Sequence, residues 1–172
     1  WYAEYVSDVY TLGLMQGSIS EYGERVFKPD GLITLAETVT LAARIHSIYY
    51  SRTLSQSGSG AWYQPYVDYA LENGILTAGE FTNYNQSATR AQFASILARA
   101  LGDEGYAEIN TVEIGAIPDV DMDQKYSFSV YNLYRAGILT GGSRGAFRPD
   151  DSIVRSEAAA VAARMVMPSM RR

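Results

Sequence analysis

The tripeptides Gly13-Leu14-Met15, Gly74-Ile75-Leu76 and Gly137-Ile138-Leu139 recur along the chain at intervals of 61 and 63 residues, and each closes a stretch rich in aromatic residues. Apolar residues stand seven and four positions before each glycine. They are Val6 and Val9, Val67 and Ala70, and Val130 and Leu133. This spacing predicts three short amphipathic helices. Each would end at its glycine, because glycine tolerates the left-handed backbone at which helices often stop.

Aromatic residues lead the first two of these helices. Trp1 and Trp62 stand twelve positions before the first two glycines, and a tyrosine follows each, whereas the third copy has Lys125 there. Aromatic rings on a short amphipathic helix more often form its packing face, so we expect most of these rings in the core. The alternative is that Trp1 and Trp62 stack on the faces of sugars.

A polar loop and a second predicted helix follow each glycine. Thr34-Leu35-Ala36-Glu37 and Thr89-Arg90-Ala91-Gln92 have the spacing of capping boxes, in which the hydroxyl and the Glu or Gln side chain each bind a free backbone N–H. Val154-Arg155-Ser156-Glu157 lacks the hydroxyl but has Glu157 at the same motif position, where we expect it to act as a helix cap. This third helix can instead start from Asp151 or Ser152.

The same register continues through the second helix of each repeat. An arginine lies ten residues after each opening position, at Arg44, Arg99 and Arg164, and the apolar positions between carry small to medium side chains. Three such helices can approach closely, and no repeat of this size buries its apolar face alone. The sequence therefore predicts an all-α fold of three tandem helix–loop–helix repeats, pseudo-threefold around a central three-helix bundle. The repeats would be residues 1–56, 57–105 and 106–172, forming one folded module.

The composition excludes several classes of protein. With 172 residues, 14 basic against 19 acidic side chains and a net charge of −5, the chain does not have the charge of a nucleic-acid-binding protein. No uninterrupted apolar run approaches the roughly 18 residues that membrane insertion needs. The absence of cysteine excludes disulfides, thiolate metal sites and a cysteine nucleophile. Because the chain starts inside a predicted helix, we expect that a targeting segment can precede Trp1.

This ordered recurrence resembles S-layer homology domains, in which an aromatic-led helix, Gly-Ile-Leu, a Phe-x-Pro turn and Thr-Arg-Ala-Glu follow one another. The turn is present as Phe27-Lys28-Pro29 and Phe147-Arg148-Pro149, and the likeness covers nearly the whole chain. Four features depart from the pattern. Leu35 replaces the motif arginine, Gln92 the glutamate and Val154 the threonine, and the turn of the second copy, residues 81–87, lacks the proline.

The resemblance implies a non-catalytic module that holds a secreted protein on the cell wall of a Gram-positive bacterium. Domains of this family are similar in having grooves between repeats that bind an anionic, often pyruvylated, secondary cell-wall polysaccharide. It implies an extracellular location at the cell wall or S-layer surface, no cofactor, and a covalently linked cargo domain outside this chain. The alternatives are a protein–protein interaction module of a bacterial surface assembly, or an appendage of a wall-processing enzyme.

Binding the carboxylate of a pyruvylated sugar calls for a planar donor fork over an apolar floor. Arg90 and Arg155 are the best candidates, since each stands one residue into a helix whose free N–H groups and dipole favour an anion. The alternative is that they only pair with surface carboxylates. Arg44, Arg99 and Arg164 lie nine positions further on, about half a turn of azimuth away. If two arginines share one groove, they must therefore come from adjacent helices. The alternative is that Arg44, Arg99 and Arg164 have a structural role and pack their aliphatic stems against the helix bundle.

Other motifs carry little chemistry. Asp119, Asp121 and Asp123 begin like a calcium loop, but the later glycine and glutamate are missing, so we expect turn or capping roles and no metal. Residues 141–145 lack the lysine of a phosphate-binding loop, and we expect a turn there. His46 is the single histidine, has no nucleophile motif around it and has no equivalent in the other copies. We therefore expect a packed or solvent-facing histidine and no catalytic activity.

Overall fold

The computed structural model describes residues 1–55, 60–142 and 145–172. It confirms the all-α prediction: pairs of helices dominate, and the strands that the described residues form are two short ones. The elements in chain order are α1 (Ala3–Thr11), β1 (Ser18–Ile19), β2 (Arg25–Val26), α2 (Leu35–Tyr49), α3 (Gln64–Glu72), α4 (Arg90–Ala98), η1 (Asp103–Tyr106), α5 (Ser127–Arg135), α6 (Arg155–Val166) and η3 (Pro168–Met170).

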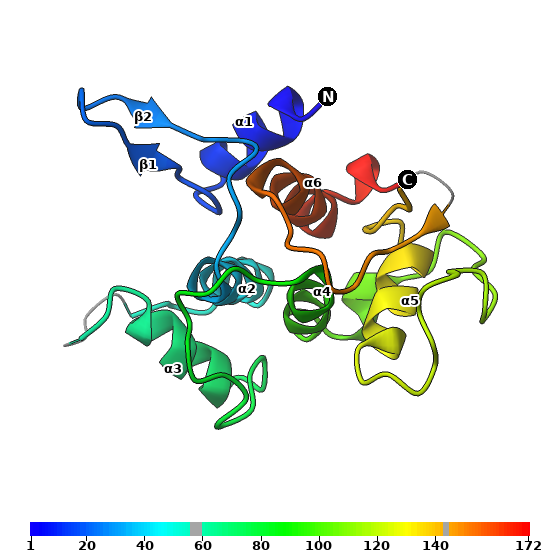
Figure 1. Cartoon of the computed structure of the whole chain (residues 1–172). Helices are drawn as coiled ribbons and strands as arrows, with labels where there is room; N and C mark the ends of the chain where they lie inside the picture. The colour runs from blue at the N-terminus through cyan, green and yellow to red at the C-terminus, as the bar shows by residue number, and fades with distance from the viewer. Residues whose placement is uncertain (56–59, 143–144) are drawn as a thin grey trace.

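The second helix of each repeat lies at the centre of the molecule. Figure 1 looks along α2, α4 and α6, with α1, α3 and α5 arranged outside them. Each outer helix packs on the central helix of the preceding repeat: α3 on α2, and α5 on α4. The N-terminal α1 packs on α6 near the C-terminus, which closes the arrangement into a ring. Neighbouring repeats are thus interleaved, and the exact repeat boundaries stay a prediction.

A ring of three backbone hydrogen bonds ties the central helices together just before they begin. The N–H of Ile33 donates to the carbonyl of Ile153 (3.1 Å), Ile153 to Ala88 (3.2 Å) and Ala88 to Ile33 (2.9 Å). All three side chains are buried. Because a buried peptide group must find a partner, this ring both satisfies the backbone and fixes the three helix starts at one level.

The helix starts agree with the sequence in two repeats and differ in the third. Complete capping boxes begin α2 and α4, as predicted from Thr34 with Glu37 and from Thr89 with Gln92. The predictions that Glu157 acts as a cap and that the third helix starts from Asp151 or Ser152 are wrong. The N-cap of α6 is Val154, and no side chain caps this helix.

The physical reason for the third start lies in another repeat. The N–H groups of Arg155 and Ser156 donate to the carbonyls of Gly31 (2.8 Å) and Pro29 (3.0 Å) in the first repeat. Val154 is extended and forms a β-bridge with Leu32. These bonds satisfy the first two N–H groups of α6, as equivalent bonds between repeats do for α2 and α4. The third N–H, which the threonine caps in α2 and α4, has no side-chain cap in α6, because Val154 has no hydroxyl.

The first helices end as the repeat pattern predicts. Gly13, Gly74 and Gly137 have φ values of 70°, 70° and 69°. The loop after Gly13 holds a feature that the pattern did not predict, a hairpin in which Ser18 pairs with Val26 and Ile19 with Arg25. The segment from Gly13 to the next helix start is 21 residues, against 15 and 17 in the other repeats, which gives this loop the length for two strands.

Candidate functional site

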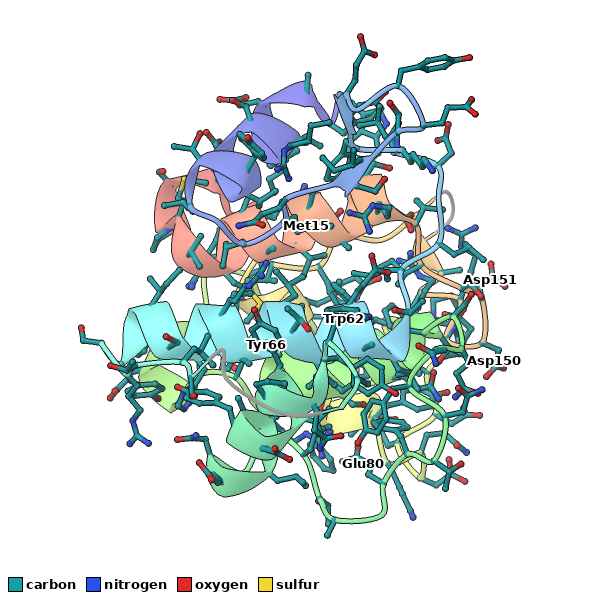
Figure 2. The ribbon with its side chains drawn as sticks, turned by 90° about the vertical axis from the view of Figure 1, so that its left-hand side faces the viewer. Met15, Trp62, Tyr66, Glu80, Asp150 and Asp151 are labelled. Carbon is teal, nitrogen blue, oxygen red and sulfur yellow. The ribbon has the colours of Figure 1, made fainter. Side chains whose placement is uncertain are left out.

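A first groove, which we call the Trp62 groove, lies between α2 and the loop that follows α1. Its volume is about 170 Å³, and its lining includes Gln16, Leu41, Arg44, Trp62 and Arg155. Figure 2 faces this side of the molecule and shows Trp62 in front of α2, with Met15 of the same groove above it on the side of α1. The lining comes from all three predicted repeats.

A second groove, the Trp1 groove, is built in the same way at α6. Its volume is about 150 Å³, and its lining includes Trp1, Arg90, Thr140, Val161 and Arg164. Each of these residues holds the repeat position of one residue in the first groove: Trp1 that of Trp62, Arg90 that of Arg155, Thr140 that of Gln16, Val161 that of Leu41, and Arg164 that of Arg44. Two of the three repeat junctions therefore present the same chemistry.

The motif arginine of the Trp62 groove is held rigidly from one side. Arg155 donates from Nε to the carbonyl of Phe27 (2.9 Å) and from Nη1 to the carboxylate of Glu37. Its guanidinium also lies over the ring of Phe27, 5.2 Å from the centroid. Carbonyl, carboxylate and ring together fix the plane of the fork, and such preorganisation favours recognition of a planar anion.

Arg90 repeats this arrangement in the Trp1 groove. Its Nε donates to the carbonyl of Phe147 (2.6 Å), its Nη1 to Glu157 (2.9 Å), and its guanidinium lies 5.4 Å from the centroid of the Phe147 ring. The pairing with carboxylates that we considered for both motif arginines is thus present, and the paired arginines also line the grooves. On the described residues, no hydrogen-bond partner lies on Nη2 of either arginine.

The expectation that free helix N–H groups assist these arginines is wrong. The N–H of Arg90 donates to the carbonyl of Asp151 (2.8 Å), and that of Ala91 to Pro149 (2.9 Å). The N–H groups of Arg155 and Ser156 are occupied in the same way by the first repeat. The first two N–H groups of each helix are thus used between repeats, and a ligand in either groove would have to be held mainly by side chains.

The arginines ten residues into the central helices join the same grooves. Arg44 donates from Nη1 to the carbonyl of Leu14 (3.0 Å) and from Nη2 to the hydroxyl of Tyr66 (3.2 Å). Arg164 makes the equivalent bonds to Ile138 (3.2 Å) and Tyr5 (3.3 Å). Both therefore tie down neighbouring loops. The Nε of Arg164 is buried and has no hydrogen-bond partner among the described residues.

Each groove thus contains two arginines from neighbouring central helices. Arg44 of α2 meets Arg155 of α6, and Arg164 of α6 meets Arg90 of α4. The two arginines of a single helix point about half a turn apart, so a groove with two arginines has to take them from two helices, as observed here.

The third junction, which we call the Lys125 junction, is different. Lys125 stands at the tryptophan position, and a fully buried Leu35 stands at the motif-arginine position. Gln92 replaces the glutamate that would hold that arginine. Arg99, the equivalent of Arg44, pairs with both carboxylate oxygens of Glu80 (2.7 and 3.1 Å). The structure does not bring Arg99 together with a motif arginine.

The two tryptophans do not belong to the core. Trp1 is 75% exposed and Trp62 is 59% exposed, so the expected packing role is wrong for both. They precede the first turns of α1 and α3, and their indoles rest edge-on against Tyr2 and Tyr63 at 5.6 Å. Tyrosines deeper in the outer helices do pack in the core as expected. These are Tyr5, Tyr66, Tyr69, Tyr131 and Tyr134.

The remaining polar motifs have structural roles. His46 is buried with its Nδ1 2.8 Å from the Tyr69 hydroxyl, and burial, aided by Arg52, lowers its pKa. Asp119 lies in a turn, as expected. Its carboxylate accepts the N–H groups of Phe147 (2.8 Å) and Arg148 (2.7 Å), a long-range contact that the sequence did not predict.

Two further observations concern metal-binding clusters and helix length. In the described ranges, no cluster of three or more metal-binding side chains occurs. None of the helices found there combines the length and the apolar character needed to cross a membrane. Of the loop at 141–145, Gly141 and Gly142 line the Trp1 groove, whereas 143 and 144 lie outside the described residues.

Comparisons with known proteins agree with this geometry. Residues 1–39 and 116–159 match the sequence profile of the S-layer homology domain. An endoglucanase of Bacillus sp. (strain KSM-635) is 32% identical over 106 residues, which are 60% of this chain and 10% of the relative. An amylopullulanase of Thermoanaerobacterium thermosulfurigenes is 29% identical over 146 residues, 83% of this chain and 7% of the relative. The chain thus spans about a tenth or less of these relatives. Residues 1–39 and 116–159 of this chain are therefore similar to the S-layer homology domain.

Proposed function

We propose that this chain is a non-covalent cell-wall anchoring module whose Trp62 and Trp1 grooves bind an anionic, pyruvylated secondary cell-wall polysaccharide. S-layer homology domains are in general cell-wall anchoring modules, which supports the coarse function. The observation that carries the finer proposal is the likeness of the two grooves. Each places an exposed indole, an apolar floor and two arginines from adjacent helices around one depression.

The groove chemistry suits a sugar that bears a carboxylate. The Nη2 groups of Arg90 and Arg155 offer charge-assisted donors, and the arginine plane is already fixed by its carbonyl, carboxylate and ring partners. A tryptophan at the rim offers a flat apolar surface for the C–H face of the sugar. Although the whole chain is acidic, the Trp62 groove has two arginines around one glutamate, and the Trp1 groove has three, because Arg148 also lines it.

The relatives, an endoglucanase and an amylopullulanase, are far longer than this chain. We propose that a covalently linked catalytic or structural domain is the cargo of this module. The module would hold that domain at the cell wall and take no part in its chemistry.

Sedimentation with purified wall sacculi tests the proposal directly. The chain should co-sediment with intact sacculi and stay in solution after the non-peptidoglycan polymer has been stripped. A Trp1→Ala, Trp62→Ala double variant should lose this retention while its thermal unfolding stays unchanged, because both indoles are exposed. Phe128→Ala is the matched control, since Phe128 is an exposed aromatic residue that lines neither groove.

Competition separates glycan binding from docking to another surface protein. A soluble pyruvylated sugar should displace the chain from sacculi. Equal retention on stripped and intact sacculi, or retention that the sugar does not reduce, would contradict the proposed ligand.

A further inference from the structure

A third depression lies on the other side of the first-repeat loop, between the β1–β2 hairpin and α1. Its volume is about 520 Å³, roughly three times that of the Trp62 groove. Tyr2, Val6, Tyr10, Arg25 and Phe27 are among its lining residues, and we call it the hairpin pocket. Aromatic and aliphatic surfaces dominate the lining, with a single cation at one edge.

The hairpin pocket and the Trp62 groove share a wall. Gln16 and Gly17 line both. Gly17 has φ +71°, and a Cβ there would lie 2.5 Å from the carbonyl oxygen of Val26, so only glycine lets the loop pass this close to β2. The second shared element is the stack of Arg155 on Phe27, in which the cation lines the groove and the ring lines the pocket.

Arg25 is positioned at this boundary. Its Nη1 donates to the carbonyl of Gln16 (2.8 Å), and its guanidinium lies 6.0 Å from the centroid of the Tyr10 ring. Tyr10 is 50% exposed, so half of its surface is available to a ligand. An aromatic wall with a few hydroxyl and guanidinium donors suits an uncharged sugar ring, which presents C–H faces and hydroxyl edges.

Among the described residues, the hairpin that walls this pocket occurs in the first repeat alone. The hairpin occupies the 21-residue segment after Gly13, whereas the equivalent segment after Gly137, beside the Trp1 groove, is four residues shorter. The two otherwise similar grooves therefore differ in what adjoins them.

We propose that the hairpin pocket binds an uncharged sugar unit of the same polymer strand whose anionic unit occupies the Trp62 groove. This inference rests on the proposed function of that groove. It makes the first repeat a two-unit site and leaves the Trp1 groove a one-unit site.

Calorimetric titration of a Trp1→Ala chain isolates the Trp62 side. Two probes are compared: the methyl glycoside of the pyruvylated sugar alone, and a wall-derived oligosaccharide of two to three units that contains it. The oligosaccharide should bind about tenfold more tightly than the single sugar, as a further ring–sugar contact would provide. Tyr10→Ala should abolish this advantage and leave the affinity for the single sugar unchanged, and Tyr10→Phe should retain most of it.

Tyr22→Ala is the matched control, because Tyr22 is an exposed tyrosine at the hairpin tip that does not line the pocket. If the single sugar binds but the oligosaccharide gains nothing, or if Tyr10→Ala weakens both probes equally, the hairpin pocket is not a sugar site. If neither probe binds, the proposed function fails and this inference fails with it.

Discussion

The Trp62 groove and the Lys125 junction occupy equivalent places in the ring, yet one retains the groove chemistry and the other retains only the fold. Glu37 combines two roles that are separate in the other repeats, helix capping and the binding of a motif arginine. One of its carboxylate oxygens accepts the N–H of Thr34 and completes the capping box, and the other accepts from Arg155. Gln92 at the Lys125 junction keeps the cap, accepting the N–H of Thr89 at 2.9 Å.

The third copy shows the opposite separation. Glu157 holds Arg90, but α6 has no side-chain cap, because Val154 stands where the other two repeats have a threonine. One motif position thus serves two independent purposes, helix capping and arginine holding. The second purpose explains why Leu35 and Gln92 occur together. An arginine at position 35 would be buried, and without a carboxylate at position 92 it would cost several kcal/mol of stability.

The largest effect should come from restoring half of the lost pair. Leu35→Arg places a cation at a fully buried position without a carboxylate, and we expect the free energy of unfolding to fall by about 3–5 kcal/mol. Adding Gln92→Glu should recover about 2 kcal/mol of that loss. Urea denaturation of the two single variants and the double variant measures the coupling. Strictly additive effects would show that the two positions do not form one junction.

The reverse exchange tests whether groove chemistry is separable from the fold. Arg155→Leu with Glu37→Gln gives the Trp62 groove the residues of the Lys125 junction. Stability should change by less than about 1.5 kcal/mol, because replacing a buried ion pair as a unit is often nearly neutral. Binding of the pyruvylated sugar should fall from two sites to one in a calorimetric titration. Two remaining sites would remove Arg155 from the proposed ligand contacts.

A smaller effect should follow from removing the cap alone. Gln92→Ala should lower the free energy of unfolding by about 1 kcal/mol through loss of the reciprocal capping bond. Gln86→Ala, in the loop just before, is the matched control and should change stability by less than about 0.5 kcal/mol, since the Gln86 side chain is exposed. Chemical denaturation measures the free energy of unfolding of both variants. Equal losses in the two variants would show that the capping bond of Gln92 does not stabilise the fold.

The smallest expected effect is the pH dependence of stability that comes from His46, which changes neither the Trp62 groove nor the Lys125 junction. Burial lowers the pKa of His46 below its ordinary value of 6.5, so the folded chain resists protonation more than the unfolded chain does. Stability contributed by the neutral ring is complete above about pH 6.5 and is lost as the pH falls below it. His46→Gln should flatten the stability profile between pH 7 and 5 in thermal melts. An unchanged slope would assign the acid sensitivity to other groups.

The sequence predicted local features and missed those that join distant residues. Helix ends at Gly13, Gly74 and Gly137, and the capping boxes at Thr34 and Thr89, depend on neighbours a few positions away, which a repeat pattern exposes. The Arg155–Glu37 pair joins residues 118 positions apart, and the start of α6 depends on carbonyls of the first repeat. No local rule reports such partners.

One signal for the pairing was nonetheless present. Leu35 and Gln92 were visible as separate departures from the motif, and reading them as the two halves of one cross-repeat contact would have located the altered junction. The hairpin carried a weaker signal, the extra length of the first loop. The exposure of Trp1 and Trp62 could have been inferred from their place before the helix, where a side chain does not share the packing face.

The ring closure of α1 on α6 has a consequence for how the chain is synthesised. The Trp1 groove joins Trp1 to α6, and the Trp62 groove needs Arg155, so neither is complete until the last repeat has left the ribosome. A partly synthesised chain would have no finished groove. Binding in either groove would therefore begin only once the whole module has been made.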